Sequence, residues 1–296
     1  MNLLVSIEHG MGWGDFMQRL ISCLNFIDFV KKNFNHIKIS FIIYEKSTNF
    51  LKDALNLDFL KSYVDEFEIR NDYYIFENFN CEFNGKKFKR LFSIFNHRGI
   101  EERCPGFWDV HGDLDNYDFL KALDLNAYQF GYRNISENQK FIPDLNFPVF
   151  NTNLYKIAKE FIKSNLPIPF ESIYYRSAGL PNLDLIGKFA SHLSKNLDKT
   201  KPYFLCSNIS DVKEKFLDTG FNLKMIRPIE SHNKNYCFGV TGIDEKIFNY
   251  LITEMVILCK SQKIHYCGDH YIVSAYNCYP VLVKGVELVN YDPILR

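Results

Sequence analysis

The residues of this chain best suited to bind an anion form a glycine turn near the N-terminus. Three glycines occupy alternate positions from Gly10 to Gly14 and lead into Asp15, between a short apolar run and an amphipathic pattern over residues 16–34. Glycines at such positions let the backbone approach a bulky ligand closely. The helix expected after the turn offers free N–H groups and the positive end of its dipole. We therefore expect Gly12 and Gly14 to contact a phosphate or a sugar nucleotide.

Two simpler interpretations of this turn stay open. A tight strand-to-helix turn in which Asp15 caps the helix would need the same residues. A dinucleotide site would need Gly-x-Gly-x-x-Gly with an acid about twenty residues further on. Here the spacing is Gly-x-Gly-x-Gly-Asp, and the next apolar strand, residues 37–43, leads to Tyr44 and Glu45. This spacing argues against an NAD(P)-dependent enzyme, which remains an alternative.

An acidic, turn-rich segment at residues 101–118 contains a second candidate site. Asp113 and Asp115 form an Asp-x-Asp pattern of the kind that can hold a divalent metal and a diphosphate. Capping of a helix expected at residues 116–125 explains the pattern equally well, and we expect no metal site. Because loops often carry binding residues, three side chains of this segment are candidates for a wall that faces an acceptor: Trp108, Asp109 and His111.

Composition limits the possible partners and surroundings. Lys and Arg together number 35 and so do Asp and Glu, so no global field attracts nucleic acid or an anionic membrane. The eight cysteines lack Cys-x-x-Cys spacing, which indicates reduced core thiols and a cytoplasmic protein. We expect no signal peptide, and the apolar run at residues 247–259 is too short and too interrupted for a membrane span.

The order of the expected elements indicates an α/β protein with two Rossmann-like domains that face each other across a cleft. Residues 3–44 predict a parallel β-α-β unit. The prolines near residues 148–170 mark a boundary, so we expect an N-terminal domain at 1–150, a linker at 151–169 and a C-terminal domain at 170–296. Strands alternate with helices again in the second half, and a ligand is expected at the carboxyl ends of the strands.

Three signatures of the second half resemble the donor domain of bacterial fucosyltransferases, namely the chitooligosaccharide fucosyltransferases and the α-1,2-fucosyltransferases. Those enzymes have a strand ending in His-x-Arg, an apolar strand ending in Ser-Asp or Thr-Asp, and then a helix, strand, loop and helix. The matching segments here are Tyr174-Tyr175-Arg176, Phe204-Leu205-Cys206-Ser207-Asn208, and residues 250–259 with 263–273. The opening Gly-x-Gly-Asp also fits, and the resemblance covers about residues 3–40 and 172–285.

The resemblance implies a site for a nucleotide sugar, with a GDP-sugar as the suspected substrate and no cofactor. A guanidinium at a strand end, as in Arg176, can hold the leaving diphosphate with two hydrogen bonds and neutralise charge as the glycosidic bond breaks. The strand near 264–266 gives way to glycine and a helix start, a second natural diphosphate site. The implied donor-binding residues are Gly12, Gly14, Ser207, Asn208, Gly268, Asp269, His270 and Tyr271.

The chain departs from the fucosyltransferase pattern at three places. Tyr174 replaces the first-motif histidine, Asn208 replaces the aspartate, and Gly268-Asp269-His270-Tyr271 replaces a phosphate loop rich in Ser and Thr. The glycine turn also resembles that of heptosyltransferases, in which the aspartate after the turn is the base. That resemblance implies a catalytic Asp15, because inverting transfer needs a carboxylate or imidazole near the acceptor hydroxyl. The competing candidates are Glu8, His9, Asp109 and His111.

These patterns together favour a metal-independent glycosyltransferase that moves a fucose-like, other deoxy or heptose sugar. We expect a carbohydrate or lipid-linked glycan as the acceptor, in surface polysaccharide or lipopolysaccharide assembly of a bacterium. The enzyme would lie in the cytoplasm, with at most peripheral contact at the inner face of the membrane. The alternative from another class is a non-catalytic protein that binds sugars or nucleotides with the same two domains.

Overall fold

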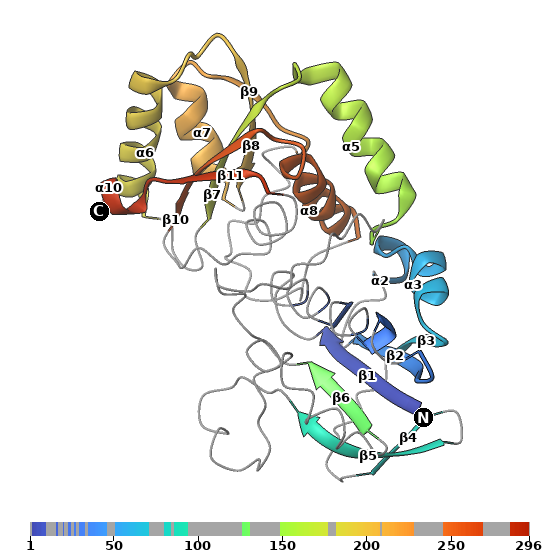
Figure 1. Cartoon of the computed structure of the whole chain (residues 1–296). Coiled ribbons are helices and arrows are strands. Elements are labelled where there is room, and N and C mark those ends of the chain that lie inside the picture. The colour runs from blue at the N-terminus through green and yellow to red at the C-terminus, as the bar shows by residue number, and fades with distance from the viewer. Residues whose placement is uncertain are drawn as a thin grey trace. The chain divides into compact units, whose positions relative to one another are not determined.

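The computed structural model describes strands and helices in both halves of the chain. The chain divides into two compact units, Met1–Val149 and Phe150–Arg296 (Figure 1). Within them the described residues are 2–9, 16, 20, 23, 24, 27, 30–32, 35–45, 51–70, 80–83, 86–93, 126–130, 149–176, 182–207, 209–227, 245–268 and 285–295.

The first unit contains a six-stranded sheet with the order β3-β2-β1-β6-β5-β4. Neighbouring strands are parallel except β4 and β5, which form the hairpin that the polar residues near Gly85 predict. The strands are β1 (Asn2–His9), β2 (Lys38–Glu45), β3 (Glu66–Arg70), β4 (Asn80–Phe83), β5 (Lys86–Ser93) and β6 (Asn126–Phe130).

The β-α-β unit expected at residues 3–44 is confirmed. β1 and β2 run parallel, and the neighbouring residues Phe41 and Ile42 of β2, whose side chains point to opposite faces, are at most 1% exposed, as in a strand covered on both faces. Between the two strands, the described apolar positions of the amphipathic pattern are helical and buried: Phe16, Leu20, Cys23, Leu24, Ile27 and Val30.

The single helix expected after β2 is instead two short helices, α2 (Leu51–Ala54) and α3 (Leu57–Tyr63). Asn56 separates them because its backbone is not helical and its side chain accepts a hydrogen bond from the Phe59 N–H at 3.1 Å. An asparagine in this position starts a new helix rather than continuing the old one.

The second unit contains a five-stranded sheet, parallel throughout, with the order β11-β10-β7-β8-β9. Its strands are β7 (Glu171–Arg176), β8 (Pro202–Ser207), β9 (Asn222–Lys224), β10 (Lys263–Gly268) and β11 (Glu287–Asn290). Its helices are α5 (Thr152–Asn165), α6 (Leu183–Asn196), α7 (Ser210–Asp218), α8 (Glu245–Leu258) and α10 (Asp292–Leu295).

Helices cover both faces of this second sheet (Figure 1). Ile173 and Leu205 pack with α6 and α7 on one face. On the other face, Phe204 contacts Phe161 of α5 with 5.8 Å between ring centroids, and α5 packs against α8. Side chains of neighbouring strand residues point to opposite faces, so a parallel sheet with apolar strands is buried on both sides. The second unit is therefore a doubly wound α/β domain.

Several expected boundaries differ from the structure. Residues 151–169, expected as a linker, belong to the second unit and contain α5, whose N-cap Asn151 accepts from the Asn153 N–H at 2.9 Å. β9 begins two residues earlier than expected. The sequence patterns missed β6, β11 and α10, and β11 is a half-buried edge strand without clear alternation. Expected elements at residues 73–76, 116–125, 272–277 and 281–283 lie outside the described residues.

The buried thiols agree with the expectation of reduced core cysteines. Among the described residues, Cys23, Cys206 and Cys267 are free and buried, and Cys259 is free and half-buried. Burial raises the pKa of the Cys23 and Cys206 thiols, since it disfavours the thiolate. In the described part of the chain, no helix has the length and apolar character that crossing a bilayer requires.

We predict that Phe189→Ala lowers the free energy of unfolding of the second unit by about 3–5 kcal/mol. Phe189 is fully buried, and its ring contacts those of Tyr175, Phe216 and Tyr291. Chemical denaturation followed by circular dichroism measures this loss. The matched control is Leu217→Ala, because Leu217 is 44% exposed and its truncation should change stability by less than about 0.5 kcal/mol. Equal effects of the two substitutions would contradict the assigned core.

Candidate functional site

The strand order of the second unit places one candidate site at the end of β7. β8 and β9 lie on one side of β7, and β10 and β11 lie on the other. In such sheets ligands bind outside the carboxyl ends of the strands, where the strand order reverses. Arg176 ends β7 and Gly268 ends β10, and the two residues are direct partners in the sheet. The structure thus brings together two residues that the sequence pattern placed 92 positions apart.

The first unit has the same arrangement around β1. β2 and β3 lie on one side of this strand, and β6, β5 and β4 lie on the other. The glycine turn follows the carboxyl end of β1 in the chain, so it leaves the sheet where its strand order reverses. The following predicted site residues lie outside the described residues: Gly12, Gly14, Asp15, Trp108, Asp109, His111, Asn208, Asp269, His270 and Tyr271.

Gly268 lets β10 end unusually close to β7. A Cβ atom at this position would lie 2.5 Å from the Arg176 carbonyl oxygen and 2.7 Å from the Tyr266 Oη, so no larger residue fits without movement. The Gly268 N–H donates to Asp292 Oδ1 at 3.0 Å. This N–H is therefore engaged within the fold, and the diphosphate site expected here would have to use the N–H groups that follow it.

Two tyrosines form the layer beneath Arg176. The Tyr174 and Tyr266 rings lie 5.6 Å apart between centroids, and both side chains are buried. Burial raises the pKa of the Tyr266 phenol well above its usual value, Tyr174 and Asp292 add to this rise, and the positive charge of Arg176 opposes it. Tyr174, which stands where the resembled enzymes have histidine, is a buried support for the site in this chain.

Ser207 shapes the turn after β8. Its side chain is fully buried, and its Oγ accepts a hydrogen bond from the Ile209 N–H at 3.1 Å. Its carbonyl oxygen accepts from Arg227 Nη2 at 2.6 Å. The hydroxyl and the carbonyl oxygen of Ser207 therefore both have hydrogen-bond partners within the protein. These two hydrogen bonds fix the direction of the chain at Ser207, just before Asn208.

A buried charge cluster of Lys213, Arg227 and Glu254 supports this turn from within the unit. Arg227 Nη2 lies 3.3 Å from Glu254 Oε2, and Lys213 Nζ donates to the Arg227 carbonyl oxygen at 3.1 Å. All three residues are at most 4% exposed. Burial lowers the pKa of Lys213 to about 8, and Arg227 adds to the shift, whereas Glu254 opposes it.

Sequence reasoning did not find this cluster. A signal was present in the helix pattern, since Glu254 interrupts an otherwise apolar run. An acid on the buried face of a helix usually has a buried cationic partner. The identity of that partner depends on the fold, because Lys213 and Arg227 come from α7 and from the segment after β9.

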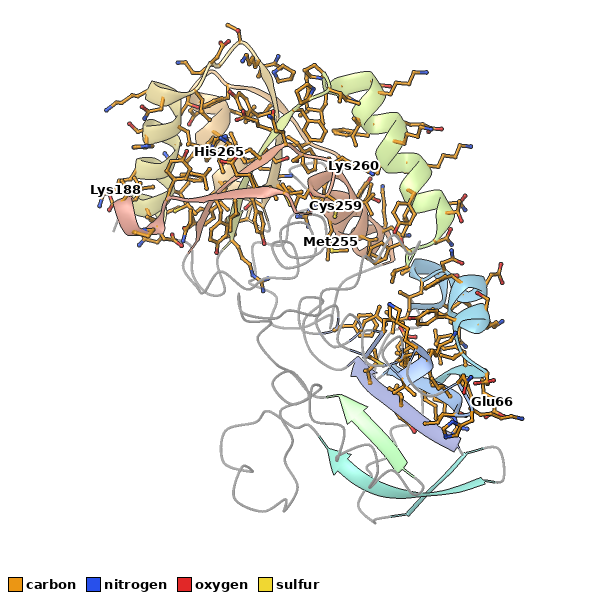
Figure 2. All side chains as sticks on the ribbon, in the orientation of Figure 1. Glu66, Lys188, Met255, Cys259, Lys260 and His265 are labelled. Carbon is orange, nitrogen blue, oxygen red and sulfur yellow. The ribbon has the colours of Figure 1, made fainter. Side chains whose placement is uncertain are left out.

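A second buried polar group, centred on His265, serves the core. His265 Nε2 lies 2.6 Å from Glu171 Oε2, and His265 Nδ1 lies 3.0 Å from the Tyr291 hydroxyl. Figure 2 places His265 inside the unit and Lys188 on its outer side. Burial lowers the pKa of His265, although Glu171 opposes the shift. Glu171 begins β7 and Arg176 ends it, so these two residues are about 16 Å apart along the strand.

The position of Glu45 bears on the alternative that the protein is an NAD(P)-dependent enzyme. In dinucleotide-binding folds, an acid near the end of the second strand binds the ribose. Here Glu45 ends β2, is 2% exposed, and accepts a hydrogen bond from the Leu51 N–H through Oε1 at 3.0 Å. Its carboxylate is used at the start of α2, which weakens the case for a bound dinucleotide.

The whole chain is similar to known structures of fucosyltransferases. The NodZ α-1,6-fucosyltransferase co-crystallised with GDP matches with a TM-score of 0.54 and 11% sequence identity, over 99% of this chain and 96% of that chain. The fold is that of the GT-B fucosyltransferases. Fucosyltransferase NodZ from Bradyrhizobium matches with a TM-score of 0.54 and 12% identity, over 99% and 96% of the two chains.

A second GT-B fucosyltransferase, POFUT1 in complex with GDP, matches with a TM-score of 0.50 and 9% identity, over 97% of this chain and 98% of that chain. No known sequence family and no curated protein sequence matches the chain. At these identities the similarity establishes the GT-B fucosyltransferase fold, which the residue patterns had predicted.

We predict that the free energy of unfolding depends on pH through Lys213. Burial lowers the pKa of Lys213 to about 8 in the folded protein, from its ordinary value of 10.5 in the unfolded chain. Between these values the unfolded state binds more protons, so stability rises with pH; the contribution is complete above pH 10.5 and is lost as the pH falls through 8. The rise should be about 3 kcal/mol.

This rise is measured by comparing denaturation curves of the wild type and Lys213→Met from pH 7 to 10.5. The difference in stability between the two proteins should change with pH, because methionine does not titrate. Lys195→Met is the matched control, since Lys195 is exposed on α6. A wild type and a Lys213→Met variant with parallel pH profiles would refute the assignment.

Proposed function

We propose that this protein is a metal-independent glycosyltransferase that transfers fucose, or a related deoxy or heptose sugar, from a GDP donor to a glycan. The observation that carries the proposal is the pairing of Arg176 with Gly268 where the strand order of the second sheet reverses. A chain of the same fold, NodZ, was co-crystallised with GDP. A cationic side chain at this position suits a nucleoside diphosphate.

In this proposal Arg176 acts on the leaving group. The bond between the sugar anomeric carbon and the diphosphate oxygen breaks, and the electron pair goes to the diphosphate. A guanidinium held at the end of β7 offsets that growing negative charge. The small Gly268 allows the ends of β7 and β10 to come together, and Asn208, Asp269, His270 and Tyr271 would complete the contacts to the nucleotide.

The acceptor would bind at the first unit, next to the glycine turn. Asp15 would take the proton from the acceptor hydroxyl as that oxygen bonds to the anomeric carbon. Gly12 and Gly14 would allow the substrates to approach the backbone, and Trp108, Asp109 and His111 would line the acceptor side. We further propose a carbohydrate or lipid-linked acceptor and a place in bacterial surface polysaccharide or lipopolysaccharide assembly, in the cytoplasm.

We predict that GDP and a GDP-sugar bind without added metal. Each should raise the melting temperature in a thermal-shift assay, because a ligand that binds only the folded state stabilises it according to its affinity. The same shift should persist in EDTA, and NAD should produce none. Loss of the shift in EDTA with recovery in Mg²⁺ or Mn²⁺ would contradict metal independence and favour Asp113 and Asp115 as ligands.

We predict that Arg176→Ala lowers turnover about 100-fold or more while acceptor affinity changes little. Such a loss corresponds to the few kcal/mol typical of a group that stabilises charge in the transition state. Arg70→Ala is the matched control, since Arg70 pairs with Glu68 on β3, and it should keep full turnover. If Arg176→Ala binds ligands and supports the biological role as well as the wild type, the non-catalytic binding protein is the correct alternative.

We predict that Asp15→Asn yields a stable, donor-binding and nearly inactive protein. Asparagine caps a helix about as well as aspartate but cannot accept the proton from the acceptor. Transfer rate, thermal stability and donor affinity are measured on the same preparation, with Asp53→Asn on α2 as the control. If Asp15→Asn retains most of the transfer rate, the base lies elsewhere, and Asp109 and His111 become the next candidates.

A further inference from the structure

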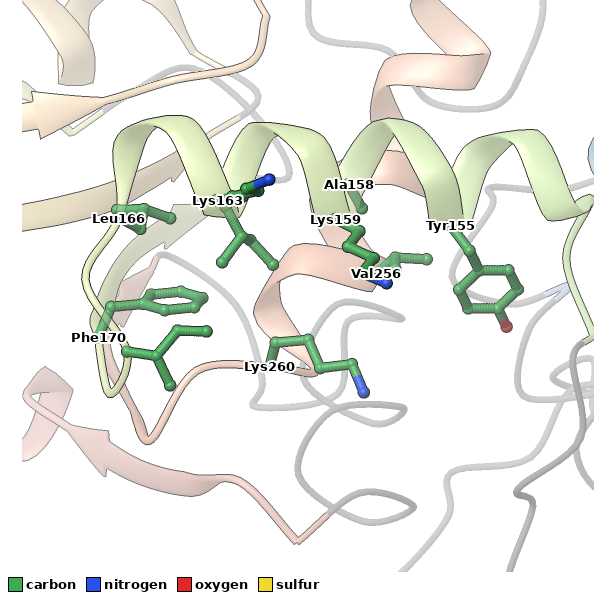
Figure 3. Close-up of a pocket in the computed structure, with 10 residues that line it drawn as sticks. Tyr155, Ala158, Lys159, Lys163, Leu166, Phe170, Val256 and Lys260 are labelled. Atoms are coloured by element: carbon green, nitrogen blue, oxygen red, sulfur yellow. The ribbon is translucent and has the colours of Figure 1, made fainter.

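A large groove lies on the second unit, on the sheet face that α5 and α8 cover (Figure 3). Its volume is about 780 Å³, within the range of sites for small organic ligands. Its lining runs along α5 from Tyr155 to Lys163 and continues through Leu166 and Phe170 to Lys260 after α8. The α5 part alone is about 12 Å long. None of the residues proposed for sugar transfer lines it.

The groove combines apolar and basic side chains. Leu166 and Phe170 lie at one end, and Tyr155 lies toward the other (Figure 3). The Lys159 and Lys260 side chains extend into the open part between these ends, and both residues are exposed. A ligand that matches this groove has a hydrocarbon part that packs against Leu166 and Phe170 and a negative charge that meets the lysines.

The surface next to the groove has further apolar and basic groups. Ile168, part of the groove wall, is 82% exposed, and Ile157 on α5 is 46% exposed. Lys163, which also lines the groove, and Lys156 add positive charge to α5, whose one acidic residue is Glu160. The whole chain has no net charge, so this positive charge is a local property of α5 and its surroundings.

We propose that the groove seats an acyl chain of an anionic phospholipid and thereby holds the second unit at a membrane surface. The chain would lie between α5 and Phe170, and the headgroup phosphate would meet Lys159 and Lys260. Ile168 would enter the outer part of the bilayer, as exposed apolar residues do at interfacial sites, and the lysines would be attracted by anionic lipids.

The lining favours a lipid over an acidic peptide. A peptide seated in the groove would need partners for its backbone N–H and C=O groups. Apart from Tyr155 and the lysines, the lining side chains are apolar, and a hydrocarbon chain requires no partner there. The membrane proposal is independent of the proposed sugar transfer, because it uses other residues.

The test is co-sedimentation of the full chain with vesicles of phosphatidylcholine alone or with phosphatidylglycerol added. We expect binding to the anionic vesicles only, and at least tenfold weaker binding for Lys159→Glu/Lys260→Glu and for Ile168→Asp. The matched controls are Lys195→Glu/Lys215→Glu and Leu217→Asp on α6 and α7. They carry the same charge changes on the opposite sheet face and should bind like the wild type.

Thermal unfolding confirms that each variant is folded, and the milder Lys159→Gln/Lys260→Gln and Ile168→Ser replace any variant that is not. Binding of the wild type to neither vesicle, or equal binding to both, overturns the proposal. So does a loss of binding that is as large in the controls as in the groove variants. If an acidic amphipathic peptide binds and the vesicles do not, the groove is a protein-docking site instead.

Discussion

The close approach of β7 and β10 at their carboxyl ends is the constraint on which the candidate site depends. The Arg176 carbonyl oxygen and the Tyr266 hydroxyl leave no room for a Cβ atom on Gly268. Asp292 then holds the Gly268 N–H from the start of α10. These contacts fix the two strand ends side by side, where the strand order of a parallel sheet creates a binding crevice.

The carboxyl end of β8, next to that of β7, is held by buried charged side chains. Taking Lys213, Arg227 and Glu254 out of water is costly, and the cost is offset only where their contacts are well made. Arg227 contacts both the Ser207 carbonyl oxygen and Glu254, so the path of the chain after β8 is coupled to α8. Burial lowers the pKa of Lys213, Glu254 opposes this shift, and Arg227 adds to it.

The two faces of the second sheet are packed differently. The face toward α6 and α7 is a continuous aromatic and aliphatic core around Phe189. On the other face, α5 and α8 leave an amphipathic groove, and none of the residues proposed for sugar transfer lines it. The two proposals, nucleotide binding and membrane contact, therefore use different residues of one α/β unit.

Local patterns in the sequence by themselves determined the fold class and most of its elements. The apolar strands, the helix period of residues 16–34 and 184–196, and the hairpin near Gly85 depend on short-range sterics and side-chain spacing, and the described residues of these segments have the predicted structure. The ordered signatures around Arg176 and Ser207 were enough to indicate the GT-B fucosyltransferase fold, which the comparisons confirmed.

Only the tertiary structure decided which of these residues meet. Local spacing carries no information on contacts between distant segments, so the pairing of Arg176 with Gly268 and the burial of Tyr174 required the strand order. The same holds for Glu254, whose partners lie on other elements, and for Ser207, whose polar groups are engaged within the fold. Burial and hydrogen bonding over long sequence separations set these roles, and they arise only once the sheet is assembled.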